Sequence, residues 1–337
     1  PSKADLNSAA QLTDTKAFVV GDYGTMLATN NRGSTWQKIN LGIKTNLSSI
    51  KFMDGDTYYN SYVIGDFGVI LRTDSHWYNW EVISVSSNYF NKDVSFANEL
   101  NGIVVGYKYL GTPEAPLSYA SILVTHDGGL TWVEKSINIV GKFNSVNFYD
   151  KDHAIAVGDA GLVAYSDDGG ENWYMHRITA RNLNAIRVCK SGVKFIVGNE
   201  GALYVAKDRH NRWENYSIGK FYDITSICQK ADNTFVIAAV KKLSLSNNIV
   251  DRDLSVILES REVNGKWEEV FSTIVGPLNA VNFCGSNSAI AVGDRGTIAV
   301  YHRLFQDTAI CVDSPAKIEM QNYPNPFNPS TLISFKL

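Results

Sequence analysis

The sequence predicts an all-β protein, a seven-bladed β-propeller of four-stranded blades followed by a short extended or β C-terminal segment. Two landmarks recur along the 337 residues, a glycine-centred apolar string in seven copies and a tryptophan in six. Four short β-type segments separated by turn residues fill each repeat of about 40 residues, which is the size of a propeller blade. One such sheet cannot bury both of its faces, but radial stacking of seven sheets covers every face and closes a ring.

The first landmark is the string VVGDYGTMLAT, which begins at Val19 and returns with substitutions along the chain. We place its marker residue at Gly21, Gly65, Gly106, Gly158, Gly198, Ala238 and Gly293. Alternating or continuous apolar residues flank each marker, which is typical of half-buried and fully buried strands. In the first repeat we expect strands at roughly 7–12, 17–21, 25–29 and 36–41.

The second landmark is a tryptophan that follows the marker. It stands 15 residues after the marker in four repeats, and 26 and 29 residues after it in the third and sixth repeats. The residues are Trp36, Trp80, Trp132, Trp173, Trp213 and Trp267. We expect this large ring at the start of the outermost strand, where the gap between blades widens. The two longer intervals contain insertions of 11 and 14 residues in the turn between the second and third strands.

The repeats also divide the chain. Residues 1–313 are expected to form the propeller, residues 314–319 a linker, and residues 320–337 the beginning of a separate C-terminal segment. The repeats run in phase from the first strand to the last, so ring closure needs no strand shared between the termini.

Composition and charge exclude several classes of protein. Lys plus Arg number 31 and Asp plus Glu 34, a formal net charge of -3, so no excess of positive charge is available to bind nucleic acid. No apolar run reaches the roughly 20 residues of a membrane-spanning helix. The cysteines lack the CxxC spacing of structural zinc sites. We expect no metal and no cofactor. Their repeat positions predict four unpaired thiols, Cys189, Cys228, Cys284 and Cys311.

Two segments, 125–132 and 166–173, have the form [ST]-x-D-x-G-x-x-W. A short Asp side chain can accept hydrogen bonds from turn amides, and Gly tolerates positive φ, so each segment favours a tight hairpin. The pattern resembles the Asp-box, or bacterial neuraminidase repeat. This resemblance implies a structural position on the propeller rim, away from a ligand site, for Asp127, Gly129, Trp132, Asp168, Gly170 and Trp173.

The combination of the glycine-centred string, a short strand and the box resembles the Ycf48-like propellers over about residues 6–302. That family is named for a photosystem II assembly factor. The resemblance implies a seven-bladed propeller, and it offers the assembly of a membrane complex as one function.

The C-terminal residues 320–335 form the string MQNYPNPFNPSTLISF, in which three prolines favour an extended entry into an alternating strand. The string resembles the opening of the type IX secretion (Por) C-terminal sorting domain through Asn322, Tyr323, Pro324, Asn325, Pro326 and Phe327. This resemblance implies that the type IX machinery exports the chain in a Gram-negative bacterium of the Bacteroidetes or Chlorobi kind. It predicts a secreted or outer-surface location, and a truncated sorting domain at 320–337.

The two inserted loops, at 107–120 and 241–254, enlarge the same turn in repeats three and six. Both therefore project from one face, on nearly opposite sides of the ring, where recognition loops are usually placed. A surface insertion without a partner is the alternative. Aromatic tips on this face suit a protein interface or a stacked sugar. The candidate contacts are Tyr23, Phe67, Tyr107, Lys108, Tyr109, Tyr119, Lys241, Lys242 and Arg252.

No motif in the chain indicates catalysis. Asp22, Asp66, Asp159 and Asp294 recur at one repeat position, which indicates turn chemistry rather than the facing carboxylate pair of a glycosidase. We expect a protein that is not an enzyme: a secreted or cell-surface interaction module, and a subunit of an extracellular or outer-membrane assembly. Two alternatives stay open, a Ycf48-like assembly factor for a membrane complex and a carbohydrate-binding or glycoside-hydrolase-type propeller. The expected partners are proteins at the outer membrane or cell surface, or a glycan.

Overall fold

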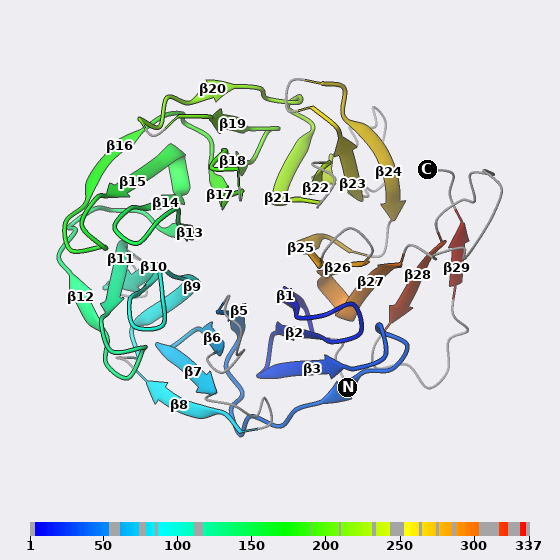
Figure 1. The fold of residues 1–337 in the computed structure, drawn as a ribbon, viewed down its shortest axis with the longest axis horizontal. Helices are drawn as coiled ribbons and strands as arrows, with labels where there is room; N and C mark the ends of the chain where they lie inside the picture. The colour runs from blue at the N-terminus through cyan, green and yellow to red at the C-terminus, as the bar shows by residue number, and fades with distance from the viewer. Residues whose placement is uncertain are drawn as a thin grey trace.

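The computed structural model is a ring of seven antiparallel sheets (Figure 1). In blades one to six the four strands follow one another in chain order from the centre outwards, and blade seven has a fifth strand. The predicted seven-bladed β-propeller is confirmed. The structure describes residues 4–53, 61–73, 79–84, 87–110, 117–189, 191–208, 210–230, 234–242, 253–262, 265–273, 276–284, 288–302, 317–322 and 331–334.

The strands have the following bounds. Blade one contains β1 (Leu6–Gln11), β2 (Ala17–Gly21), β3 (Thr25–Thr29) and β4 (Gln37–Lys38). Blade two contains β5 (Leu47–Phe52), β6 (Ser61–Gly65), β7 (Val69–Thr73) and β8 (Glu81–Ser84). Blade three contains β9 (Tyr89–Phe96), β10 (Gly102–Tyr109), β11 (Ser118–Thr125) and β12 (Val133–Lys135). Blade four contains β13 (Phe143–Phe148), β14 (Ala154–Gly158), β15 (Leu162–Ser166) and β16 (Tyr174–Arg177).

The remaining blades follow the same plan. Blade five contains β17 (Leu183–Val188), β18 (Lys194–Gly198), β19 (Leu203–Ala206) and β20 (Glu214–Asn215). Blade six contains β21 (Tyr222–Gln229), β22 (Phe235–Lys241), β23 (Leu254–Ser260) and β24 (Glu268–Thr273). Blade seven contains β25 (Leu278–Cys284), β26 (Ser288–Gly293), β27 (Thr297–His302), β28 (Lys317–Asn322) and β29 (Thr331–Ser334). Two short 3-10 turns, η1 (Asp159–Gly161) and η2 (Asp294–Gly296), follow β14 and β26.

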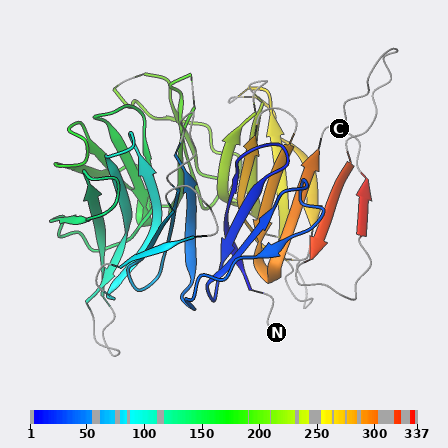
Figure 2. The same cartoon turned by 60° about the horizontal axis from the view of Figure 1, so that its bottom comes forward.

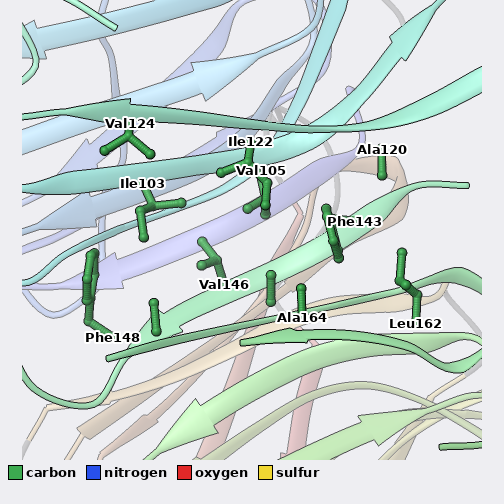
Figure 3. Packing of buried hydrophobic residues seen from close by; sticks show 12 residues of the cluster. Ile103, Val105, Ala120, Ile122, Val124, Phe143, Val146, Phe148, Leu162 and Ala164 are labelled. Atoms are coloured by element: carbon green, nitrogen blue, oxygen red, sulfur yellow. The ribbon is translucent and has the colours of Figure 1, made fainter. Parts of the chain in front are cut away.

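Each blade is buried on both faces by its neighbours. Every residue of β2, β6, β14 and β18 is buried, which explains why these strands are continuous rather than alternating apolar runs. Among the described residues, an apolar cluster lies at each of the seven seams between blades. Figure 3 shows the seam where Ile103 and Val124 of blade three face Val146 and Leu162 of blade four. The core is therefore a ring of interblade layers.

The ring closes between blades seven and one, and each of these blades is built from consecutive segments of the chain. Asn279 Nδ2 donates a hydrogen bond to Leu6 O at 3.0 Å. Arg295 N donates to Asp5 Oδ1 at 2.7 Å. An apolar cluster with members from both blades fills the same seam. Side-chain packing and these bonds close the ring, without a strand exchanged between the termini.

The marker glycine is required where the two innermost strands of a blade approach closely. A Cβ on Gly158 would lie 1.9 Å from Lys142 O, a distance that no side chain can adopt. The strand register corrects the position of the marker in blade six. Ile224, the counterpart of Leu6, pairs with Ala239, so Ala239 and not Ala238 holds the marker position. A shift of one residue was hidden in the sequence because both candidates are alanines.

The end of the chain differs from the expected division. β28 pairs with β27 from Thr297↔Asn322 to His302↔Lys317, and thus supplies the fourth strand of blade seven. A boundary between residues 319 and 320 would fall inside this strand. Cys311, one of the four predicted unpaired thiols, lies outside the described residues. So do most of the residues that resemble a sorting domain, Tyr323, Pro324, Asn325, Pro326 and Phe327.

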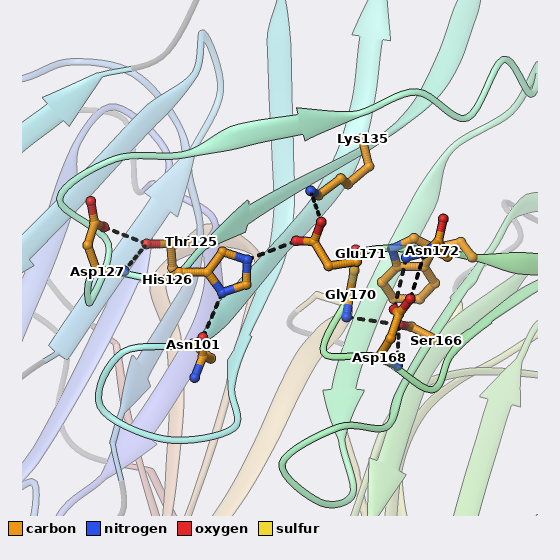
Figure 4. Close-up of polar contacts among 11 residues, drawn as sticks. Asn101, Thr125, His126, Asp127, Lys135, Ser166, Asp168, Gly170, Glu171 and Asn172 are labelled. Atoms are coloured by element: carbon orange, nitrogen blue, oxygen red, sulfur yellow. Dashed lines mark hydrogen bonds and ion pairs between the residues drawn. The ribbon is translucent and has the colours of Figure 1, made fainter.

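The two Asp-boxes form the turns between the third and fourth strands of blades three and four, on what we call the Asp-box face (Figure 4). Thr125 Oγ1 donates to Asp127 Oδ1 at 2.8 Å and accepts from Gly129 N at 2.9 Å. Thr131 N donates to the same carboxylate at 2.9 Å. Burial by itself raises the pKa of Asp127, but the hydrogen bonds from Thr131 and Thr125 outweigh it and lower that pKa to about 2. The second box repeats the arrangement with Ser166, Asp168 and Gly170.

The box also fastens the repeat tryptophan. Trp132 Nε1 donates to Gly129 O at 3.1 Å, and Trp173 Nε1 donates to Gly170 O at 2.8 Å. Each indole packs on the preceding blade through the apolar cluster at that seam. These contacts give the box residues a role in closing the seams between blades.

Candidate protein-interaction face

The turns between the second and third strands form the opposite face of the ring, which we call the turn face (Figure 2). Asn7 Nδ2 donates to Asp22 Oδ1 in its own blade and to Leu47 O in the next blade, both at 2.9 Å. The same pair of bonds recurs in blades four, five and seven, from Asn144, Asn184 and Asn279. The asparagine therefore links the two blades, and the turn aspartate (Asn199 in blade five) holds its amide in place.

The residue at the tip of these turns projects from the face. Tyr23 and Phe67 adopt φ values of 57° and 58°, in the left-handed region where side chains other than those of Gly, Asn and Asp are uncommon. The same conformation recurs in Ala160, Glu200 and Arg295. A hydrogen bond across the seam fixes the backbone, as from Tyr23 N to Asn46 Oδ1 at 3.2 Å. The tip is thus a fixed display position: Tyr23 is 65% exposed and Phe67 52%.

An aromatic row crosses blades two and three on this face. Phe67 lies 5.5 Å from Phe90 between ring centroids, and Phe90 stacks on Tyr107 at 4.9 Å with an interplanar angle of 4°. Phe90 and Tyr107 are direct cross-strand partners of β9 and β10. The sequence analysis did not single out Phe90, and only the register of this strand pair identifies it. The predicted residues Phe67 and Tyr107 are therefore joined into one surface by a residue that was missed.

Two lysines lie over the end of this row. The Nζ atoms of Lys142 and Lys92 lie 4.5 Å and 5.8 Å from the centre of the Tyr107 ring. Neither lysine forms an ion pair with a carboxylate in the part of the chain that the structure describes. Burial raises the pKa of Tyr107, helped by the negative charges of Asp66 and Asp159. We call Phe67, Phe90, Tyr107, Lys92 and Lys142 the aromatic–lysine row.

The extended hairpin of blade three borders the row. β10 and β11 stay paired out to Tyr109↔Ser118. Between this hairpin and the chain after β12 lies a groove of about 560 Å³, lined in part by Lys108, Leu110, Leu117 and Tyr119. At its floor Lys108 pairs with Glu134, which also accepts a 2.7 Å hydrogen bond from Tyr89. Four predicted contacts, Tyr107, Lys108, Tyr109 and Tyr119, thus belong to one continuous region.

The candidate contacts of blade six are not part of that region. Lys241 Nζ lies 2.8 Å from Glu269 Oε2, and Lys242 Nζ lies 2.6 Å from Asp223 Oδ2. Hydrogen bonds to these carboxylates raise the pKa of both lysines. Arg252 lies outside the described residues. Blades three and six stand on opposite sides of the ring (Figure 1), so the predicted contacts form two separate groups.

Large apolar side chains are exposed mainly on the turn face. Among the described residues, those that project from its turns and connections are Tyr23, Phe67, Tyr109, Leu110, Leu117, Val140 and Phe221. The Asp-box face exposes Leu100 and Leu130. The outermost strands expose Val82, Val133 and Tyr174. Exposed large apolar side chains are therefore concentrated on the turn face.

Other kinds of site find little support. Within the described ranges, no group of three or more His, Cys, Asp or Glu side chains is arranged to hold a metal ion. The same ranges contain no helix long and apolar enough to cross a bilayer. Cys189 and Cys228 are free thiols, and burial raises their pKa values to about 11 and about 12. The side chain of Cys284, like Cys311, lies outside what the structure describes.

Comparison with known proteins identifies the repeat. The family described as photosynthesis system II assembly factor YCF48 matches residues 74–241, about half of the chain. The chain carries a Ycf48-like propeller. Two solved structures, YCF48 bound to D1 peptide and YCF48 from Cyanidioschyzon merolae, each align over 90% of this chain with a TM-score of 0.66. The alignments cover 93% and 97% of those chains at 16% and 19% identity, which shows a shared fold.

One further solved structure has a similar fold at lower sequence identity, and two relatives match over part of this chain. The GH74 xyloglucanase of Xanthomonas campestris aligns with a TM-score of 0.64 and 11% identity, over 89% of this chain and 52% of its own. The photosystem II stability/assembly factor HCF136 of Arabidopsis thaliana chloroplasts is 30% identical over 103 residues, 28% of this chain. The photosystem II assembly lipoprotein Ycf48 of Synechococcus sp. CC9902 is 29% identical over 130 residues, 36% of this chain. These two matches cover only 25% and 35% of the relatives' own lengths.

The comparisons overturn the expected location. The relatives are photosystem II assembly factors of cyanobacteria and chloroplasts, so the prediction of a secreted or outer-surface protein of a Bacteroidetes- or Chlorobi-like bacterium is wrong. That prediction rested on the last residues of the chain, whereas the family match rests on the repeats. The comparisons do not show a type IX sorting domain.

Proposed function

We propose that this Ycf48-like propeller is a non-catalytic assembly factor that holds a segment of a membrane-complex subunit on its turn face. The aromatic–lysine row beside the blade-three groove is the observation that carries the proposal. Support comes from the match to the YCF48 family, and from one of the similar solved structures, in which YCF48 is bound to D1 peptide. Interaction with a protein was our leading expectation, and assembly of a membrane complex was its alternative.

The chemistry of the row suits a peptide. Stacked rings present a rigid apolar surface at little cost in side-chain entropy, and aromatic anchors dominate binding at protein interfaces. Lys92 and Lys142 add positive charge that no described carboxylate neutralises. The groove of about 560 Å³ in the same blade offers a recess with apolar side chains, such as Leu110 and Leu117, beside the Lys108–Glu134 pair. The preferred segment therefore combines an apolar side chain with a carboxylate, from an acidic residue or a chain end.

Site-directed photo-cross-linking tests the proposal in native membranes solubilised with a mild detergent. A photoreactive phenylalanine analogue at position 67 should cross-link one subunit of a membrane complex. The same analogue at position 174 is the matched control, because Tyr174 is 65% exposed but lies on the outermost strand of blade four. Tyr107→Ala should lower the cross-linking yield from position 67 by about 5-fold to 50-fold, as loss of an interface anchor does.

The outcomes separate the possibilities. Tyr107→Phe retains the ring and should retain most of the yield. Equal cross-linking from positions 67 and 174 would contradict a specific face, and a yield unaffected by Tyr107→Ala would remove the row from the interface. Cross-links from position 67 to soluble proteins alone would contradict the role in assembling a membrane complex.

A further inference from the structure

A second hollow lies on the rim of the ring, between blades five and six. It has a volume of about 670 Å³, within the range of about 300–1,000 Å³ usual for small-molecule sites. Its walls come from the chain at and after β20, from the start of β21, from β23 and from the chain just before β24. Blades five and six are neighbours in Figure 1. The described residues that line it are all uncharged, and they include Asn215, Tyr216, Tyr222 and Trp267. The hollow is therefore suited to a neutral ligand.

The hollow lies where the Asp-box has been lost. The box in blade six begins with Ser260, but Glu262 and Asn264 stand at the positions of the box Asp and Gly. In blades three and four the box glycine carbonyl accepts the hydrogen bond of the repeat tryptophan. Trp267 Nε1 has no hydrogen-bond partner among the described residues. Trp267, a half-buried residue that lines the hollow, thus carries an unused indole donor.

Neighbouring charged side chains hold two of the aromatic rings of the hollow in place. Tyr216 Oη donates to Glu214 Oε2 at 2.5 Å. Lys241 Nζ lies 5.8 Å from the centre of the Tyr222 ring, and Glu269 fixes that lysine. Both rings are half-buried, like Trp267, so each keeps part of its surface open. Three aromatic side chains are therefore presented on a rigid frame.

Asn215, an exposed residue that lines the hollow, carries a second donor. Asn215 Oδ1 accepts hydrogen bonds from Ser217 N at 2.9 Å and Ser217 Oγ at 2.6 Å. These bonds fix the amide with its Nδ2 group directed away from Ser217. No described residue accepts a bond from Nδ2. The hollow thus contains two N–H donors without acceptors among the described residues, beside open aromatic faces.

We propose that this rim pocket binds a short neutral oligosaccharide. The C–H faces of sugar rings stack on aromatic side chains, and sugar hydroxyls accept hydrogen bonds from indole and amide N–H groups. The absence of charge among the described lining residues disfavours phosphorylated or acidic ligands. The site lies on the rim, apart from the aromatic–lysine row in blades two to four, so it does not depend on the proposed assembly function.

Nuclear magnetic resonance of the indole N–H groups tests the pocket directly. The probes are neutral hexasaccharides of glucose (β-1,4 and α-1,4), xylose, mannose and N-acetylglucosamine. Saturable binding of at least one of them should shift the Trp267 resonance, which is assigned by its loss in Trp267→Phe. Removal of the donor in Trp267→Phe, or of a stacking face in Tyr216→Ala, should weaken binding at least 10-fold.

Trp132→Phe is the matched control, because it removes an indole donor that is already bonded to Gly129 O. This variant should bind the same glycan with unchanged affinity, and thermal unfolding of all variants shows whether each is folded. Absence of saturable binding to every hexasaccharide would overturn the proposal. It would equally be overturned if a proline-rich peptide, another ligand of aromatic grooves, shifted Trp267 while the sugars did not.

Discussion

Blades four and six descend from one repeat and differ in how much of it they retain. Blade four has the marker Gly158, an intact box at Asp168 and a tight turn at 159–161. Blade six has Ala239 at the marker position, Glu262 at the box Asp position, and a long insertion in the same turn. Both blades have four paired strands with apolar clusters on either side. The neighbouring blades bury the faces of an eroded blade, so its turns are free to change.

New surfaces arise in this propeller where a blade departs from the repeat. Where the box is intact, Trp173 is fastened by its N–H group and the seam is closed. Where the box is lost, Trp267 keeps an unused donor and a pocket of about 670 Å³ opens beside it. Enlargement of the turn in blade three creates the other recess, the groove of about 560 Å³ on the turn face. Departures from the repeat thus coincide with both recesses described above.

The marker position should give the largest effect. Gly158→Ala places a Cβ 1.9 Å from Lys142 O, and the resulting strain should reduce the free energy of unfolding by about 2–4 kcal/mol. In blade six the reciprocal change Ala239→Gly should cost only about 1 kcal/mol, from the greater backbone freedom of glycine in a strand. Urea unfolding of both variants measures the difference. Equal losses would show that blade four does not depend on the glycine.

The box should give an intermediate effect. Asp168→Ala removes acceptors for Ser166 Oγ, Asn172 N and Asn172 Nδ2, all within 2.9 Å, and should cost about 1–2 kcal/mol. Glu262→Ala at the matching position of blade six should change stability by less than about 0.5 kcal/mol, since this side chain is exposed. Shifts in the urea midpoint provide the comparison. A loss in blade six as large as that in blade four would mean that the eroded turn keeps the function of the box.

The pH dependence of an intact box should be the smallest effect. In blade three the pKa of Asp127 is lowered from 3.8 to about 2 in the folded protein, so the charged form stabilises the fold. The stability difference between wild type and Asp127→Asn should be fully present above about pH 4 and disappear as the pH falls towards 2. Asp127 is only part-buried and solvent screens its charge, so the difference should stay below about 1 kcal/mol. A difference that grows with acidification would contradict this sign.

Much of the fold could be predicted because the repeat is encoded locally. The marker string, the box and the tryptophan spacing predicted the number of blades and the face on which each turn lies. The missed elements depend on strand register or on a neighbouring blade. Phe90 joins the row only because β9 and β10 pair it with Tyr107. The sixth marker was placed one residue early, since Ala238 and Ala239 differ only in their partners.

The face on which the candidate contacts lie could be predicted, but their neighbours in space could not. The position of the insertions correctly placed Tyr107, Tyr109 and Lys241 on the turn face, because turns of one type share a face. It could not show that Glu269 and Asp223 occupy the lysines of blade six. Nor could it show that Lys142, from the connection into blade four, lies over Tyr107. Charge neutralisation is a property of side chains that meet in space, and the chain order does not reveal it.

Local patterns in the sequence specify the propeller, its seven blades and the chemistry of its tight turns. The hydrogen bonds of the box and the close approach at the marker glycine join residues a few positions apart or adjacent strands of one blade, so each repeat that keeps these motifs shows their requirements in its own sequence. Which recesses stay open, and which charged side chains lack an ion pair among the described residues, depends on the folded ring. These properties depend on side chains from neighbouring blades, about 40 residues or more apart in the chain, that only the closed ring brings together.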